Sequence, residues 1–383
     1  FLRDLRISSA DSDKTYEDLI VTLSANPPFL KPKSWRFDRI GPNSTASVKD
    51  RDVELDGGFL LTLADSVRGN TTVTVEHDGQ VIAEEAKPIE LLAYNEWGGS
   101  GSMPELLAAF SMPNDPVIDR ILHDASLILR RASKPDGIDG YKSKSRQRVW
   151  ELASAIYAAI CNLGISYAVP PASFERDGQK IRLPGQILEN RVATCLDTAM
   201  LFSAALEQAG LNPVVALPRG HAVVGVWLQP DELASIVVDD AETLRKRIQL
   251  KELILIETTF VTSHPAPPFS KTVAIAEESI SPEKDDTFHA AVDIRRARSH
   301  RIFPLCRKSE IRSTTGETDT PVTELPLEEA PPLPDFGNEL EVETKPETPA
   351  GRLERWQRKL LDLSARNPLL NHKSEKTSLR LLC

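Results

Sequence analysis

Three side chains that could act together on a carbonyl group lie in order along the chain. Cys195 begins an apolar run that predicts a helix, His221 precedes a strand-like run, and Glu257 ends a third apolar run. A thiol at a helix start, followed by an imidazole and a carboxylate at strand ends, is typical of cysteine nucleophile sites. The predicted chemistry is acyl transfer, in which the thiol attacks, the imidazole carries the proton and the carboxylate holds the imidazole.

Such a thiol must be activated, because an ordinary thiol with a pKa of ~8.5 is only a few per cent thiolate at neutral pH. Thr194 fits a helix N-cap and Asp197 follows three residues later, so Cys195 is expected in the first helical turn, where the helix dipole favours an anion. We expect the sulfur of Cys195 at ~3–4 Å from one nitrogen of His221, with Glu257 on the other nitrogen. We also expect an open cleft at the sulfur.

Two further roles in this chemistry have candidate residues. The backbone N–H of Cys195 is a natural donor to an oxyanion, and the Gln186 side chain, nine residues upstream, is a second candidate donor. Asp239 and Asp240 compete with Glu257 as the acid. Because both aspartates precede a helix-like segment, helix capping is the stronger interpretation for them.

A structural interpretation competes with the catalytic one. A lone cysteine in an apolar helix is more often a small buried hydrophobe than a nucleophile. Cys161 fits that role, because it lies in the last turn of a predicted core helix. For Cys195 the three-part arrangement favours a catalytic site. The alternative is a sensor or docking module with a vestigial Cys-His-Glu site.

Composition limits the classes of protein that need consideration. The 383 residues suffice for two or three domains, and no apolar run reaches the ~18 residues of a membrane helix. The four cysteines form no C-x-x-C pair and the seven histidines share no ligand spacing, which predicts a cytoplasmic protein without disulfides, metal or cofactor. Residues 1–307 are mildly acidic, so DNA is not an expected partner of this part, and neither is a membrane.

Residues 1–97 are predicted to form an Ig-like antiparallel β-sandwich. Alternating residues flank Asp78-Gly79, a turn pair typical of a β-hairpin, and residues 19–23, 35–40 and 59–63 read as further strands. No helix is expected before the glycine-rich residues 98–101, which read as a hinge between domains.

Residues 102–305 are predicted to form an α+β domain. A helix is expected from Pro116, with Asp115 as its cap, because Pro is favoured at the first helical position. The remaining expected elements are helices at 145–162, 195–209 and 240–249 and strands at 213–217, 222–228 and 253–257.

The C-terminal part is expected to differ from the rest. Residues 308–350 contain seven prolines and eleven acidic residues against three basic ones, which predicts a disordered linker. Residues 352–363 then predict an amphipathic helix with a leucine stripe. Its basic residues are interpreted as a solvated face rather than a phosphate site.

Several segments resemble known families. Residues 178–184, 194–197, 206–211 and 220–228 resemble a transglutaminase-like, papain-like domain, in the version found near the N-terminus of large bacterial superfamily-1 DNA helicases. Residues 352–383 resemble the opening of the helical domain of unknown function that precedes the helicase core in those proteins. Pro28-Phe29-Leu30 and Asn95-Glu96-Trp97-Gly98 fit their N-terminal sandwich.

The resemblance implies a parent protein with an ATP-dependent helicase motor that acts in phage defence or DNA processing, and a C-terminal helicase core as the partner of this chain. The chain itself has no P-loop sequence. Ala193 stands where transglutaminase-like enzymes usually have glycine, and Glu257 replaces the usual aspartate. After His221 the chain has Ala222-Val223, where many such enzymes have a tryptophan. These departures imply a cysteine peptidase or amidase acting on a protein or peptide, rather than a crosslinking enzyme.

Overall fold

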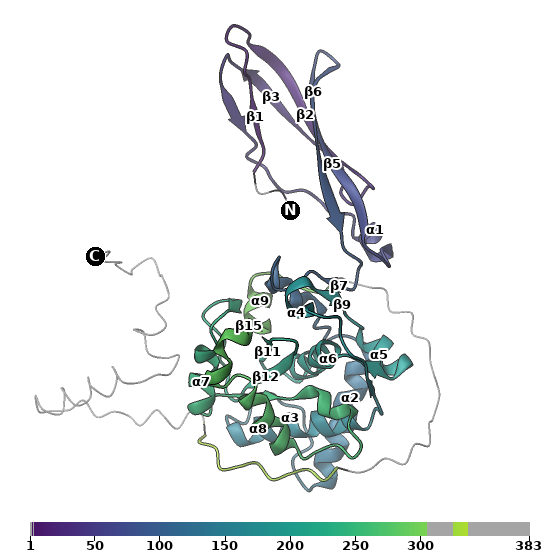
Figure 1. The fold of residues 1–383 in the computed structure, drawn as a ribbon, viewed down its shortest axis with the longest axis vertical. Coiled ribbons are helices and arrows are strands. Elements are labelled where there is room, and N and C mark those ends of the chain that lie inside the picture. Colours follow the sequence, from purple (N-terminus) through teal and green to yellow (C-terminus); the bar gives the residue numbers. More distant parts are fainter. Residues whose placement is uncertain (1, 3, 305–324, 336–383) are drawn as a thin grey trace, which may run out of the picture. The chain divides into compact units, whose positions relative to one another are not determined.

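The chain divides into two compact units, Phe1–Glu96 and Trp97–Cys383 (Figure 1). The computed structural model describes residues 2, 4–304 and 325–335. Both units are rich in antiparallel strands, and the second mixes them with helices, so the chain is a mixed α and β protein. The predicted helix at 352–363 lies outside the described residues.

The first unit contains a four-stranded antiparallel sheet in the order β3-β2-β5-β6 and a two-stranded pair, β1-β4. The expected hairpin joins β5 to β6 through Asp78 and Gly79, whose φ values of 51° and 75° are those that a two-residue hairpin turn requires. The strands are β1 (Arg6–Ser8), β2 (Tyr16–Asn26), β3 (Lys33–Ile40), β4 (Thr45–Ser47), β5 (Val67–His77) and β6 (Gln80–Leu91).

The two sheets of the first unit share an apolar core. Leu19 and Val21 alternate inward along β2, as the period of two predicts. Ile7 of β1 and Ala46 of β4 pack against them. The small pair of strands therefore covers part of one face of the larger sheet.

The predicted strand at 59–63 is wrong, because residues 59–62 belong to helix α1 (Gly57–Thr62) and Leu63 is its C-cap. Asp56 caps the helix by accepting a hydrogen bond from the backbone N–H of Phe59 at 2.9 Å. Phe59 and Leu63 are also four residues apart, so the short alternation fits a helical turn as well as a strand. The expectation that no helix precedes residue 98 fails with it.

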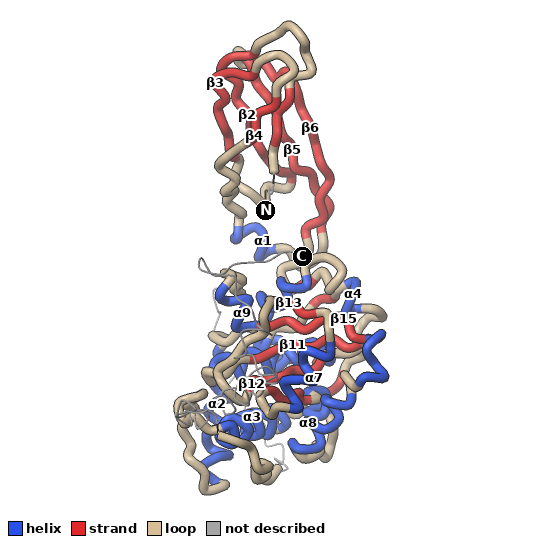
Figure 2. The backbone as a smooth tube through the Cα atoms, turned by 90° about the vertical axis from the view of Figure 1, so that its left-hand side faces the viewer, coloured by secondary structure: helices blue, strands red, loops and turns tan. Residues whose placement is uncertain are grey.

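The second unit is built on a five-stranded antiparallel sheet in the order β13-β15-β11-β12-β14, with helices on both faces (Figure 2). Nearly every residue of the central strands is buried, so the sheet lies inside the unit. Its strands are β11 (Pro213–Pro218), β12 (Val223–Trp227), β13 (Val237–Val238), β14 (Leu253–Ile256) and β15 (Phe288–Asp293).

Alternate side chains of the sheet enter two different cores. Val215 and Val224 join the core that contains α2, α3 and α6, whereas Val214 and Val223 join the core with α7 and α8. Helix α6 is buried from Cys195 to Leu206, as its continuous apolar sequence predicts. The helices are α2 (Pro116–Arg131), α3 (Arg146–Cys161), α6 (Cys195–Gln208), α7 (Ala241–Gln249), α8 (Phe269–Glu278) and α9 (Ile294–Ser299).

The helices and strands expected between residues 116 and 257 are present, each within one or two residues of the expected bounds. Three elements beyond them were not expected: α8, β15 and α9. Shorter elements complete the unit. They are β7 (Glu96–Trp97), β8 (Ser166–Tyr167), α4 (Phe174–Asp177), β9 (Gln179–Lys180), α5 (Pro184–Asn190), β10 (Val192–Ala193), η1 (Pro104–Phe110), η2 (Thr258–Thr262) and η3 (Pro282–Thr287).

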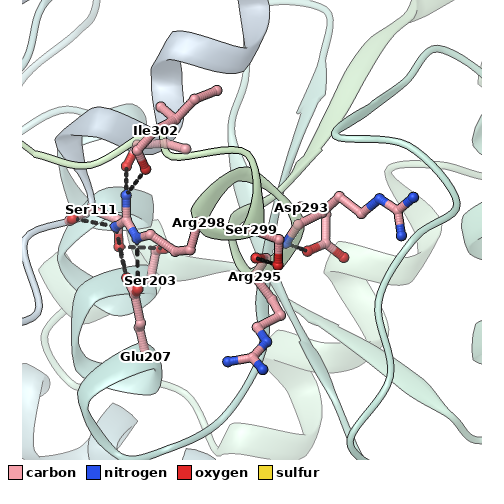
Figure 3. Close-up of polar contacts among 10 residues, drawn as sticks. Ser111, Ser203, Glu207, Asp293, Arg295, Arg298, Ser299 and Ile302 are labelled. Carbon is pink, nitrogen blue, oxygen red and sulfur yellow. Dashed lines mark hydrogen bonds and ion pairs between the residues drawn. The ribbon is translucent and has the colours of Figure 1, made fainter.

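An arginine of α9 anchors the C-terminal end of α6 (Figure 3). Nε and one terminal nitrogen of Arg298 donate to the two carboxylate oxygens of Glu207 at 2.8 and 2.9 Å. The same guanidinium donates to the backbone carbonyls of Ala108, Ser111 and Ile302. This planar, fully bonded cation fixes the end of α6 opposite to the one that begins with Cys195.

Residues 325–335 are the described part of the predicted linker. They contain no helix or strand, and Leu325, Leu327, Ala330 and Leu333 pack against the core of the second unit. Residues 308–324 and 336–350 of that linker lie outside the described part. Among the helices that the structure describes, none is long and apolar enough to cross a membrane.

Candidate active site

The pairing of β12 with β14 brings a histidine and a carboxylate together. Val224 lies opposite Ile256 in this antiparallel pair, so the beginning of β12 is beside the end of β14. His221 lies two residues before β12 and Glu257 directly follows β14. The two side chains meet at this edge, where Nε2 of His221 is 2.6 Å from Oε2 of Glu257.

A tight turn after β11 sets the position of His221. Gly220 has a φ of +69°, in the left-handed region that glycine adopts without strain. The backbone N–H of His221 donates to the carbonyl of Pro218 at 3.0 Å and closes the turn. The imidazole is therefore held by its backbone as well as by Glu257.

Hydrogen bonds hold both the carboxylate and the backbone of Glu257. Its Oε1 accepts hydrogen bonds from the backbone N–H of Thr259 at 3.0 Å and from the Thr259 hydroxyl at 2.5 Å, which caps η2. Its backbone N–H donates to the carbonyl of Thr272 in α8 at 3.2 Å. Only Oε2 is left for the imidazole, so the carboxylate has a single orientation.

Cys195 is the first residue of α6, as the sequence predicts. The Thr194 hydroxyl accepts from the backbone N–H of Asp197 at 3.2 Å, and Asp197 Oδ2 accepts from the Thr194 N–H at 2.8 Å. This is the expected reciprocal capping box. Arg182 donates to the same buried carboxylate through its N–H and its guanidinium, each at 2.8 Å. The backbone N–H of Cys195 belongs to the helix-start groups that have no partner within the helix.

A hydroxyl bridge links the helix of the thiol to the segment of the acid. Thr198 Oγ1 donates to the Cys195 carbonyl at 2.9 Å and is 2.9 Å from the hydroxyl of Thr258, which directly follows Glu257. All three groups are buried. The relative position of the thiol and the carboxylate is therefore fixed by side chains that do not take part in the chemistry.

The Cys195 thiol interacts with the His221 ring and with the Tyr167 hydroxyl closely enough to raise the pKa of both. Because Nε2 of His221 is bound to Glu257, Nδ1 is the ring nitrogen left for the thiol. Tyr167 reaches the thiol through β8, which pairs with β10 so that Tyr167 lies opposite Ala193, two residues before Cys195. No sequence signal singles out Tyr167, because both strands have only two residues and pair over a long sequence separation.

The charges of these groups depend on one another. Burial works to lower the pKa of His221, but hydrogen bonds with Cys195 and Glu257 outweigh it and raise this pKa to about 10. Burial works to raise the pKa of Glu257, yet hydrogen bonds from His221 and Thr259 leave it below its ordinary value. Burial and the charge of Cys195 raise the pKa of Tyr167 to about 12, so its hydroxyl stays a donor at neutral pH.

The expectation of an open cleft at the sulfur is wrong for this conformation. Cys195 has 0% of its surface exposed, whereas Tyr167 is 44% exposed and the His221 side chain 27%. Both of these partly exposed side chains interact with the thiol. The sulfur itself has no exposed surface.

The other candidates have structural roles. Gln186 Oε1 accepts from the backbone N–H of Leu183 at 3.0 Å and so helps to cap α5. Asp240 caps α7 by accepting from the N–H of Glu242 at 2.9 Å, and Asp239 is exposed. Cys161 is buried, and burial raises its pKa to about 12.

Neither a model of a known protein family, nor a curated protein sequence, nor a solved structure matches this chain. Within residues 2, 4–304 and 325–335, no three His, Cys, Asp or Glu side chains are grouped so as to hold a metal ion.

The coupled charges predict a characteristic pH dependence. Cys195 and Glu257 both raise the pKa of His221, and Glu257→Gln removes the second of these partners. The pKa of His221 should therefore fall from about 10 toward neutral values. An NMR titration of the imidazole protons measures this change. A His221 pKa that stays near 10 in Glu257→Gln would contradict the account.

The shifted pKa values of His221 and Glu257 also determine how the stability of the fold depends on pH. The folded pKa of His221 lies above 6.5, so its stabilisation is complete below about pH 6.5 and is lost as the pH rises toward about 10. Glu257 has a lowered pKa, so its stabilisation is present above about pH 4.5 and is lost as the pH falls. Urea unfolding should show the largest difference between wild type and Glu257→Gln in the interval between these limits.

Proposed function

We propose that residues 102–305 form a cysteine acyl-transfer enzyme of the peptidase or amidase type. The observation that carries the proposal is the 2.6 Å contact between His221 and Glu257, together with the interaction of the same ring with the thiol of Cys195 at the start of a helix. Covalent catalysis by a thiol requires a nucleophile next to a base and an acid on the far side of that base. Cys195, His221 and Glu257 are of these three types.

The proposed reaction has two halves, acylation of the sulfur and hydrolysis of the thioester. The same three side chains act in both. In the resting state the proton of the Cys195 thiol is held by His221 as an imidazolium, and the Cys195 thiolate attacks the carbonyl carbon of an amide. The backbone N–H of Cys195 donates to the resulting oxyanion. The imidazolium then gives its proton to the leaving amine, and a thioester remains on the sulfur.

Water completes the cycle. His221 takes a proton from a water molecule that attacks the thioester carbon, and the sulfur leaves as the acid is released. The imidazolium and the thiolate that this step leaves are the starting pair. Glu257 holds the ring throughout and stabilises its charged form, so it gains no proton at any step.

Burial energetics favour a functional origin for this cluster. Removing charged groups from water costs several kcal/mol for each ion, so a purely structural site would be more stable with apolar side chains. Groups with strongly shifted pKa values concentrate at functional sites. His221 and Glu257 show opposite shifts despite their burial.

A second candidate function is a sensor or docking module with a vestigial Cys-His-Glu site. The observation that favours it is the complete burial of Cys195. The two candidates differ in whether the sulfur can be reached from solvent, which Tyr167 controls in this conformation.

We also propose a wider setting from the resemblances in the sequence. The chain would be the N-terminal regulatory or accessory part of a superfamily-1 DNA helicase, with an Ig-like first unit and a transglutaminase-like second unit. The order of a nucleophile helix followed by antiparallel strands that carry the histidine and the acid supports the second assignment. The helicase core would be its partner, and a cytosolic protein or peptide its substrate.

The first test is alkylation of Cys195 by iodoacetamide across pH, followed by mass spectrometry of the Cys195 peptide. If His221 holds the thiol proton, Cys195 should react at about pH 6, and His221→Ala should slow this reaction about tenfold or more. Cys161 in the same molecule is the internal control. Equal rates with and without His221 would contradict the proposal.

An activated ester separates catalysis from a vestigial site. p-Nitrophenyl acetate should acetylate Cys195, and the acetyl group should then be lost as His221 activates water. Continued release of p-nitrophenol supports the enzyme. A single acetylation without turnover supports the vestigial module instead.

Tyr167 has a separate predicted effect on access. Tyr167→Ala removes the partly exposed ring of a residue that interacts with the buried thiol, and it should raise the alkylation rate at about pH 7 severalfold because the sulfur becomes more accessible. Tyr167→Phe keeps the ring and should show a smaller gain. Val169→Ala, at a side chain with 83% exposure two residues away, is the matched control. An equal gain in the control would exclude this role.

A further inference from the structure

The start of helix α8 lacks a capping side chain from its own sequence. Pro268 occupies the N-cap position and makes no side-chain hydrogen bond to the helix. The first N–H groups of any helix need partners outside the helix, and an apolar cap leaves them without one. A capping group for α8 must therefore come from elsewhere in the chain.

Glu328 is that group, although it is 58 residues away in the sequence. Its Oε2 accepts from the backbone N–H of Ser270 at 2.7 Å, and its Oε1 accepts from the Ser270 hydroxyl at 3.2 Å. A carboxylate at a helix start also interacts favourably with the helix dipole. Both oxygens of Glu328 are thus used to complete α8.

Residues 325–335, which we call the strap, carry Glu328 to this position. Apolar side chains on either side of Glu328 pack against the core of the second unit. Glu329, the next residue, adds to the effect of Glu151 in raising the pKa of Lys134, which follows α2. The charge of Glu328 raises the pKa of Tyr157 in α3. The surface beneath the strap therefore accepts an acidic segment that is rich in leucine and proline.

The same first turns of α8 hold the acid of the candidate active site. The carbonyl of Thr272, two residues after Ser270, accepts the backbone N–H of Glu257 at 3.2 Å. Thr272 is fully buried and its hydroxyl donates to the carbonyl of Phe269 at 2.7 Å, so it moves only with the helix. Glu328 and Glu257 are thus bound to α8 two residues apart.

We propose that Glu328 of the strap is a positioning residue for Glu257, because its cap on α8 fixes the Thr272 carbonyl that holds Glu257 against His221. The catalytic meaning of this contact rests on the proposed function. The positioning itself concerns only the geometry of the His221–Glu257 pair. A partner that bound the strap and lifted it from α8 would weaken the pair without touching it.

The test is an NMR titration of the His221 imidazole in the full chain. The charged groups that face this ring, Glu257 and Cys195, are unchanged in every variant, as is Tyr167 beside the thiol. Glu328→Ala should lower the proton affinity of His221 about threefold or more, because a looser carboxylate stabilises the imidazolium less. Glu328→Gln, which keeps an acceptor oxygen but no charge, should show a smaller decrease.

Glu329→Ala is the matched control, because Glu329 is the exposed neighbour of Glu328 and does not contact α8 through any hydrogen bond in the described residues. It should leave the titration of His221 unchanged. A Glu328→Ala variant that melts at a lower temperature but titrates like wild type would overturn the proposal and leave a purely structural cap. An equal shift in Glu329→Ala would overturn it as well.

The readout separates this proposal from the proposed function. The imidazole titrates whether or not Cys195 forms a thioester, so an inactive thiol still leaves the strap open to test. Conversely, a normal reaction with p-nitrophenyl acetate together with an unchanged His221 titration in Glu328→Ala would overturn the strap alone. If Glu328→Ala does not fold, as judged by circular dichroism, the same comparison between Glu328→Gln and Glu329→Ala decides.

Discussion

The hydrogen bond between His221 and Glu257 depends on one register, that of β12 against β14. Both side chains lie just beyond the pairing of Val224 with Ile256, at adjacent ends of two antiparallel strands. A slip by one residue would turn the neighbouring side chains to the opposite face of the sheet. Since both faces are buried against helices, such a slip would also bury the wrong side chains in each core. The large apolar core thus enforces the geometry of a small polar site.

Electrostatics of the site follow from competition between burial and pairing. Burial alone would neutralise the imidazole, but its two partners reverse that effect and raise its pKa to about 10. Cys195 itself is fully buried, whereas Tyr167 and the His221 side chain, which interact with its thiol, are partly exposed. A charged pair is therefore stabilised by the contacts that restrict access to it.

Local sequence rules predicted the parts of the site that depend on near neighbours. The capping box joins Thr194 to Asp197, three residues later. His221 was predicted because it directly precedes one apolar run, and Glu257 because it ends another. Tyr167 could not be found in this way, because a two-residue strand leaves no periodic pattern and its partner lies in β10. Glu328 was hidden for the same reason, since it caps a helix 58 residues away.

The fold shows the same division between local and distant causes. The hairpin at Asp78-Gly79 follows from its turn residues, whereas β15 was missed although it lies between β13 and β11. Alanines such as Ala290 and Ala291 favour strands only weakly. They form a strand here because they are buried and paired with β11 and β13 on either side. Helix α1 was mistaken for a strand because six residues fit either period.

We propose that Cys195 and His221 form a thiolate–imidazolium pair at neutral pH. The most direct measurement is the ultraviolet absorbance of the thiolate across pH, taken as the difference between wild type and Cys195→Ser. The account predicts thiolate absorbance at about pH 7 that is lost in His221→Ala. Absorbance that appears only as an ordinary thiol ionises, at ~8.5 and above, and that does not depend on His221 would contradict it.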